Sequence, residues 1–257
     1  MIAGPAFAGI LLSKFSVTFV YCIDALTFLI SIFCILKAGD LPKLETPSKF
    51  SLAFIKEGMK YASSRQELAG TYIVDILAMA FSMPHLLFPA VAEFFGHKEG
   101  LGWLHSSLAV GALIATIFSG WTAKRVRHGM IISFAASAWC LAMIGFGYSI
   151  NMWWALGFIF LAGYFDMISA IFRTRVWNET IPDSIRGRMA GIEMISYMSG
   201  PLIGNAQLGF MAEKLGIMPA ISLSSLVGFI SVGVATCLLP KFWIYNSAKY
   251  HSENPQK

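Results

Sequence analysis

The sequence predicts an all-α membrane protein, and three observations carry this prediction. Hydrophobic residues make up 56% of the chain, charged residues 13%, and the mean hydropathy is +0.66, whereas an ordinary soluble domain is about 25% charged. The apolar residues form long runs of the roughly 20 residues that cross a hydrocarbon core about 30 Å thick. Lysine and arginine gather in alternate loops, as expected for a multi-pass membrane protein.

Seven runs are long enough to be complete spans, and each is followed by a charged or turn-forming segment. A further apolar stretch, Met1–Ser13, would reach only about 20 Å as a helix, so we interpret it as the tail of an eighth span. A signal peptide fits poorly because this stretch has no basic residues at its start. The predicted complete spans are Ser16–Leu36, Leu68–Glu93, Leu101–Thr122, Gly129–Ser149, Asn151–Phe172, Met189–Ala212 and Met218–Pro240.

The basic residues of the loops predict the orientation. One set of alternate loops carries 16 of the 19 lysines and arginines and the other set carries three. Basic residues near span ends favour the cytoplasmic side, so the carboxyl terminus is predicted to be cytoplasmic. This orientation also accounts for the formal net charge of +5, and we therefore expect no nucleic-acid partner.

The residue patterns favour neither a cofactor site nor an enzyme. All four cysteines, Cys22, Cys34, Cys140 and Cys237, lie inside predicted spans, without C-x-x-C spacing or a histidine at ligand spacing, so we expect no metal. The chain has no G-x-x-x-x-G-K-[ST], H-E-x-x-H or G-x-S-x-G sequence. We therefore expect no cofactor and no enzymatic activity, and an intramembrane enzyme is the weaker alternative.

A Gly-Pro pair followed by a glycine occurs twice. Gly4, Pro5 and Gly9 form the first copy, and Gly200, Pro201 and Gly204 form the second, near the other end of the chain. Each copy precedes a short loop with one lysine and then one more span, as expected for two homologous helix bundles. We expect these residues to pack helices closely, although glycine and proline are also simply common in membrane helices.

Further segments resemble the major facilitator superfamily of transporters. "GWTAKRVRHG", with Gly120, Lys124, Arg125 and Arg127, resembles the G-x-x-x-D-R-x-G-R loop of that superfamily, with Lys124 where an acidic residue often stands. "TIPDSIRGRMAG" resembles the P-[DE]-x-x-R-G-R segment of the exporter branch that contains enterobactin exporters. "YCIDALTF", "MPHLLFP", "LGWLHSSLAVGALI" and "EGMKYA" are similar to that branch too.

The resemblance implies a fold of two six-helix bundles, of which this chain corresponds to the end of the fifth helix through the twelfth. Residues 1–36 would be a remnant of the amino-terminal bundle, comprising a partial span (1–13) and a full span (16–36). Residues 37–67 would form a cytoplasmic linker with an interfacial helix, residues 68–240 a complete carboxyl-terminal six-helix bundle, and residues 241–257 a cytoplasmic tail. The chain is thus expected to be amino-terminally truncated, as a gene fragment, a split or decayed frame, or a miscalled start, and a separately encoded amino-terminal half is an expected partner.

Polar side chains within the spans are candidate working residues, because burying a carboxylate in a membrane costs about 2.5 to 3.5 kcal/mol. Asp24, Asp75 and Asp166 are predicted to couple protons or line the substrate path, or else to form structural ion pairs. His85 lies between Pro84 and Pro89 in a broken span, about 15 Å further along it than Asp75. The two side chains would take up and release protons along the substrate path, or His85 would act as a polar cap. Asn205 and Gln207 would bind substrate or bond to a neighbouring helix.

The resemblance also implies a cytoplasmic gate. Its expected members are Gly120, Lys124, Arg125, Arg127, Pro182, Asp183, Arg186, Gly187 and Arg188, although anchoring by positive charge is an equal explanation for the arginines. Thr180 and Asp183 fit a capping box that would start a short helix there.

The resemblance implies an exporter of small amphipathic molecules in the bacterial inner membrane, and the carboxylates within the spans favour proton coupling. The expected partners are the lipid bilayer, a substrate and protons. A non-transporting membrane remnant of such a transporter is the alternative.

Overall fold

The computed structural model describes residues 17–37, 52–97 and 99–248, and the chain divides into two compact units, Met1–Ser51 and Leu52–Lys257. The first unit contains one described helix, α2 (Val17–Lys37). Its 21 residues span about 31 Å at 1.5 Å per residue, which matches a hydrocarbon core. Its described side chains are nearly all exposed within this unit, and Asp24 is among the exposed ones. Gly4, Pro5 and the predicted partial span 1–13 lie outside the described residues.

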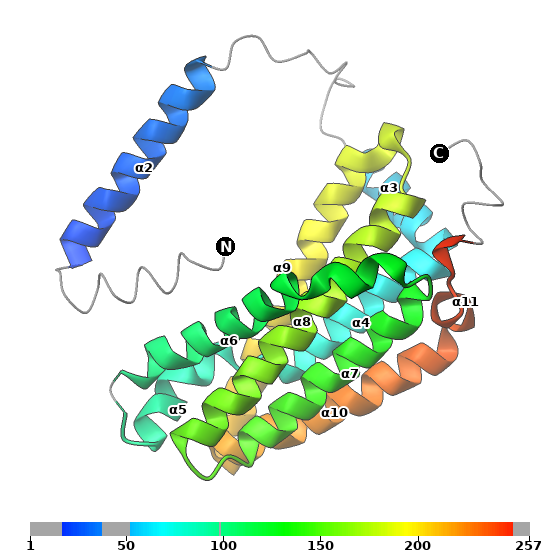
Figure 1. The fold of residues 1–257 in the computed structure, drawn as a ribbon. Helices are drawn as coiled ribbons and strands as arrows, with labels where there is room; N and C mark the ends of the chain where they lie inside the picture. Colours follow the sequence, from blue (N-terminus) through cyan, green and yellow to red (C-terminus); the bar gives the residue numbers. More distant parts are fainter. Residues whose placement is uncertain (1–16, 38–51, 98, 249–257) are drawn as a thin grey trace. The chain divides into compact units, whose positions relative to one another are not determined.

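The second unit is a bundle of helices, drawn from cyan to red in Figure 1, and the described residues contain no strand. The prediction of an all-α membrane protein is confirmed. The helices are α3 (Leu52–Ser64), α4 (Gln66–Ser82), η1 (His85–Leu87), α5 (Phe88–Phe94), α6 (Gly100–Ile117), η2 (Ser119–Lys124), α7 (His128–Gly147), α8 (Met152–Thr180), α9 (Asp183–Leu215), α10 (Ile217–Leu238) and α11 (Pro240–Trp243).

The long helices pack in a continuous chain of neighbours. α6 lies against α8, α8 against α7, and α7 against α10, while α4 contacts α9, α10, α7 and α8. Small residues let these backbones approach each other. A Cβ atom at Gly163 of α8 would collide with the backbone of Leu108 in α6, and one at Gly111 of α6 would collide with the backbone of Phe160 in α8. Close contact at glycines is the usual way in which membrane helices associate.

Six described helical segments are long and apolar enough to span a membrane: Thr18–Lys37, Gln66–Phe94, Gly100–Ile117, His128–Gly147, Met152–Thr180 and Ile217–Leu238. The remaining predicted span, Met189–Ala212, lies within α9. This helix has 33 residues and is long enough, but it is less apolar because it carries several Gly, Ser, Asn and Gln residues. Many of these small and amide side chains lie against α4 and α10 instead of facing lipid, as the contacts below show.

The end of α8 differs from the prediction. The predicted span stopped at Phe172, whereas α8 continues to Thr180, so Arg173 and Arg175 lie in a helix and not in a loop. The predicted capping box is wrong, because the Thr180 hydroxyl donates back to the Val176 carbonyl (2.6 Å) within α8. α9 starts at Asp183 after Pro182, without a side-chain cap, and the expected short helix is the first part of α9.

Helix α3 coincides with the predicted interfacial helix but packs into the second unit, against α9 and α4. Its packed face carries Gly58, next to Ile192, and Tyr61, whose hydroxyl donates to the Thr180 carbonyl (2.6 Å). Among the apolar residues spaced along one side of α3, Ala62 is buried and Met59 is exposed, and the side chains of Leu52 and Ile55 lie outside the described part. Contact with the bundle therefore uses Gly58, Tyr61 and Ala62.

The start of the predicted tail is also part of the bundle. Phe242 of α11 is fully buried, and the absence of side chains at Gly70 of α4 and Gly129 of α7 makes room for it. The Lys241 amide donates to Gln66 Oε1 (2.8 Å) at the start of α4. α11 thus closes the end of the bundle where α4 begins and α8 ends, which we call the basic end; it carries Lys124, Arg125, Arg127, Arg175, Arg186, Arg188 and Lys241.

Candidate functional site

An ion pair lies inside the bundle between α4 and α8. Arg173 of α8 contacts Asp75 of α4, and the two side chains are only 3% and 6% exposed. Arg173 Nη2 also lies 3.9 Å from Asp166 Oδ1, two turns earlier on α8. Since α8 extends to Thr180, Asp166 is at the midpoint of the helix. A buried charge pair is costly to form, and in a membrane protein such groups mark functional sites by default.

Helix α9 adds a third carboxylate to this site. Glu193 interacts electrostatically with Arg173 and is hydrogen-bonded to Tyr197 one turn later. The Arg173 guanidinium lies 5.7 Å from the centre of the Tyr197 ring, in cation–π geometry. One guanidinium thus faces three carboxylates from three helices. We call Asp75, Asp166, Arg173, Glu193 and Tyr197 the charged cluster.

Aromatic rings support the charged cluster on the side toward the basic end. The rings of Tyr72 and Trp177 stack with centroids 5.4 Å apart, and Trp177 meets Tyr197 edge to face at 5.9 Å. Trp177 Nε1 donates to Thr71 Oγ1 (2.8 Å), which fixes the indole against α4. Aromatic pairs of this geometry contribute about 0.5 to 1.5 kcal/mol beyond burial. They hold α4, α8 and α9 in register around the ion pair.

Several buried polar atoms at the same place lack hydrogen-bond partners. They are the Tyr72 hydroxyl, Arg173 Nε and the Ser196 hydroxyl, among the described side chains. More than nine in ten buried polar groups in proteins are satisfied. In the described part of the chain, unsatisfied polar atoms are thus concentrated between α4, α8 and α9.

The predicted span Leu68–Glu93 is broken after α4, and the side-chain amides of Asn205 and Gln207 make hydrogen bonds to the backbone at this break. α4 ends at Ser82, since Pro84 has no N–H to continue the helix, and its last carbonyls need other donors. Gln207 Nε2 donates to the Ala80 carbonyl (3.5 Å) and also to the Ser224 hydroxyl. The Ser224 hydroxyl donates to the Phe81 carbonyl (2.5 Å), and Trp139 Nε1 donates to the Ser82 carbonyl (3.2 Å).

On the other side of the same break, Asn205 Oδ1 accepts a hydrogen bond from the Leu86 amide (3.5 Å). Both amides of α9 therefore bond to a neighbouring helix, which was one of the two readings left open by the sequence. His85 lies beside them in η1, with its ring 5.8 Å from that of His105 and 5.0 Å from that of Phe88. His85 thus contacts the α5–α6 region, whereas Asp75 contacts α8.

The second Gly-Pro motif packs α9 against α4. A Cβ atom at Gly204 would lie 2.6 Å from the Met79 carbonyl oxygen, and one at Gly200 would lie 2.9 Å from the Met79 side chain. Pro201 stands inside α9 between them. These contacts orient the face of α9 that carries Glu193, Ser196 and Gln207 toward α4, because residues three, four and seven apart share a helix face.

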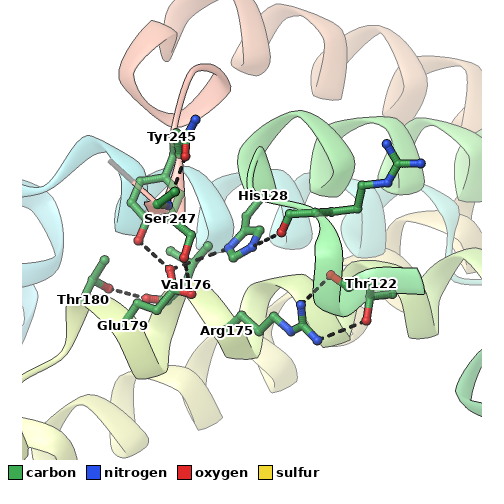
Figure 2. A network of polar contacts seen from close by, with 11 residues as sticks. Thr122, His128, Arg175, Val176, Glu179, Thr180, Tyr245 and Ser247 are labelled. Atoms are coloured by element: carbon green, nitrogen blue, oxygen red, sulfur yellow. Dashed lines mark hydrogen bonds and ion pairs between the residues drawn. The ribbon is translucent and has the colours of Figure 1, made fainter. Parts of the chain in front are cut away.

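A second polar network, shown in Figure 2, ties the basic end together. Glu179 of α8 accepts from the Tyr245 hydroxyl (2.8 Å) and the Ser247 hydroxyl (2.7 Å), and lies 3.7 Å from His128 Nδ1 at the start of α7. Arg175 donates to the carbonyl and the hydroxyl of Thr122 in η2 (2.6 and 3.1 Å). The Glu179 carboxylate thus links the segment after α11 to α7 and α8.

The predicted gate residues occupy the surface of the basic end. Gly120, Lys124, Arg125, Arg127, Arg186 and Gly187 are exposed, and Pro182 precedes α9. Arg125 lies over the Trp121 ring at 5.9 Å. Arg188 pairs with Glu57 of α3 at 2.8 Å, which joins α3 to α9. The side chain of Asp183 lies outside the described part.

Sequence reasoning missed Arg173, Glu193, Tyr197 and Glu179. The predicted span Asn151–Phe172 ends one residue before Arg173, which places Arg173 in the following loop, two turns after Asp166. One signal was available: Asp166 and Arg173 are seven residues apart and so share a helix face, which favours a helix that continues past Phe172. Glu193 and Tyr197 have the similar spacing of four.

The comparisons with known proteins agree with this architecture. The model of the family described as transmembrane secretion effector (MFS_3) matches residues 2–256. The enterobactin exporter EntS of Escherichia coli O1:K1 is 24% identical over 241 residues, which cover 93% of this chain and 57% of that protein. The EntS protein of Citrobacter koseri is 25% identical over the same shares.

The chain therefore spans a little more than half the length of the curated relatives it matches. No solved structure has significant similarity to it. The family match covers nearly the whole chain, and the helices are those of a multi-pass membrane protein, for which the family implies the bacterial inner membrane. The chain belongs to the transmembrane secretion effector family of major facilitator transporters.

Proposed function

We propose that this chain provides the carboxyl-terminal bundle of a proton-coupled exporter of small amphipathic molecules, which works by alternating access, and that it is not an enzyme. The observation that carries the proposal is the buried pair of Asp75 and Arg173 between two membrane-spanning helices. Support comes from the family and from relatives that are named as exporters. Enterobactin, the compound in the name of those relatives, is a first test substrate.

The pair suggests how proton binding alters the bundle. Protonation of Asp75 removes the charge that holds Arg173 to α4, and Asp166 at 3.9 Å and Glu193 remain as alternative partners. Arg173 then shifts toward α8 and α9, which weakens the link between α4 and α8. Protonation of Asp75 thus replaces one set of ion pairs of Arg173 by another. A proton can drive a conformational change only if it binds more strongly to one conformation than to the other.

The proposal also includes the orientation of the chain in the membrane and its partners. The basic end faces the cytoplasm, since lysine and arginine gather there, and substrate and protons pass between this bundle and an amino-terminal half. The alternative is a membrane protein that does not transport.

Transport in vesicles tests the proposal. The chain is reconstituted with a co-expressed amino-terminal half, and export is driven by a pH gradient or measured as downhill exchange without one. We expect Asp75→Asn to abolish pH-driven export while downhill exchange and the amount of protein in the membrane are preserved. Glu213→Gln, which removes an exposed carboxylate at the end of α9, serves as the matched control and keeps full activity.

Three results would count against the proposal. Undiminished pH-driven export by Asp75→Asn would exclude Asp75 as the coupling acid. Loss of the variant from the membrane would make Asp75 a structural residue. Absence of all transport with the amino-terminal half present would favour the non-transporting alternative, whereas transport by the chain alone would indicate a functional assembly of its own copies.

A further inference from the structure

The charged cluster has an inner and an outer layer. Asp75 and Arg173 form the inner layer and neutralise each other, and both are almost completely buried. Asp166, Glu193 and Tyr197 form the outer layer: the Asp166 side chain is 41% exposed, Tyr197 is 42% exposed, and Glu193 is half-buried. With the single guanidinium already paired to Asp75, the outer layer presents two carboxylates beside an accessible aromatic ring.

Two unsatisfied hydroxyl groups adjoin this outer layer. Tyr72 and Ser196 are 7% and 6% exposed, and neither hydroxyl has a hydrogen-bond partner among the described residues. Tyr72 interacts electrostatically with Glu193 and Tyr197. Ser196 lies one turn before Gly200, whose contact with Ile76 and Met79 turns this face of α9 toward α4. Both hydroxyls therefore lie at the seam of α4 and α9, next to Glu193.

The chemistry of these groups selects the ligand. Carboxylates and hydroxyls accept hydrogen bonds, and a protonated primary amine has three N–H donors and no acceptor. The face of Tyr197 attracts a cation, and the phenol ring also packs against apolar groups. An anion would instead meet two carboxylates in a medium of low dielectric constant, and it would have to separate Arg173 from Asp75. The charge balance thus favours an organic cation.

We propose that the outer layer, with the hydroxyls of Tyr72 and Ser196, is a binding site for an amphipathic primary ammonium ion. The ammonium group lies between Asp166 and Glu193 and donates to the two hydroxyls, and the apolar body covers Tyr197. The interpretation of this ligand as a transported substrate rests on the function proposed above, whereas the binding itself does not.

Binding to the purified chain in lipid nanodiscs tests the site. The probe is dansylcadaverine, a primary ammonium with a fluorescent apolar body. Its N-acetyl derivative is the matched neutral control, and dansyl-aminohexanoate is the anionic one. Empty nanodiscs correct for partition into lipid. We expect saturable binding of the amine, with at least about tenfold weaker binding of both controls, as loss of one charge-assisted contact predicts.

Variants locate the binding. The double change Asp166→Asn with Glu193→Gln is expected to weaken amine binding by about tenfold or more, and Ser196→Ala, a small change that preserves packing, by about threefold to tenfold. The matched control is Glu99→Gln with Glu213→Gln, which removes two exposed carboxylates elsewhere and leaves binding unchanged. Unfolding temperatures verify that each variant is folded.

Equal binding of the amine and its N-acetyl derivative would overturn the proposal, and so would unchanged amine binding in both the double variant and Ser196→Ala. Preferred binding of the anion, lost in Arg173→Gln, would make the cluster an anion site instead. Failure of amine binding with intact pH-driven export would contradict only this site. Amine binding without any transport would contradict the proposed function and leave the site standing.

Discussion

Arg173 of α8 and Asp75 of α4 form an ion pair inside the bundle, with both side chains nearly inaccessible. The two residues come from helices that are far apart in the sequence, and both charges are buried. Asp166 provides Arg173 with a second carboxylate at 3.9 Å, whereas no second cation near Asp75 is found in the described part of the chain.

This asymmetry predicts unequal effects of single changes. Arg173→Gln leaves Asp75 as an unpaired buried charge and is expected to destabilise the bundle by about 3 to 5 kcal/mol. Asp75→Asn is expected to cost less, because Arg173 keeps Asp166. Thermal unfolding in detergent measures both, together with the double variant, which is expected to be more stable than Arg173→Gln. A double variant that is less stable than either single variant would show that the pair does not interact as described.

Two glycines of α9, Gly204 and Gly209, are expected to differ in how much a larger side chain destabilises the bundle. Gly204→Val places its side chain against the backbone of Met79 and Ala80 and is expected to cost about 1 to 3 kcal/mol or to separate α9 from α4. Gly209→Val is the matched control, because nothing lies within 4 Å of a Cβ atom there. The stability of the two variants in the same detergent decides the matter, and equal losses would contradict the packing of α9 on α4.

The burial of Phe242 predicts that the segment after α10 stabilises the fold. Phe242→Ala leaves a cavity beneath Gly70 and Gly129 and is expected to cost about 3 to 5 kcal/mol. Its neighbour Trp243 is 41% exposed, and Trp243→Ala is expected to cost about 1 kcal/mol or less. Unfolding temperatures compare the two variants. A Phe242→Ala protein as stable as Trp243→Ala would mean that the segment is a free tail, as the sequence suggested.

The proposed orientation is tested by labelling single cysteines with a thiol reagent that does not cross the membrane. Ile150 is 80% exposed in the α7–α8 turn, and Ile150→Cys is expected to react in intact cells. Ser184→Cys, at the basic end, is expected to react only after permeabilisation. Ile150 is preferable to Asn151, whose side chain accepts from the Trp154 amide and caps α8. The four native cysteines are first replaced, and the reverse labelling pattern would invert the topology.

The predicted sites show where sequence reasoning reached its limit. Asp75, Asn205 and Gln207 were recognisable because polar residues are rare in apolar runs, and such residues must find partners. Their partners were not recognisable. Gln207 and Ser224 donate to carbonyl groups of α4 that have no donor within the helix because Pro84 ends it. These two donors come from helices that follow much later in the chain.

Consecutive residues are enough to predict the fold class, the positions of the apolar helices and the alternation of loop charge, because hydropathy and helical length are local properties of the chain. Contacts between distant helices bury Arg173, place α11 in the core and bring Asp75, Asp166 and Glu193 around one guanidinium, and no local pattern encodes these contacts. A membrane span is predicted to end where its apolar residues end. The helix itself continues wherever other helices supply partners for its polar side chains, and α4 and α9 supply those partners to Arg173.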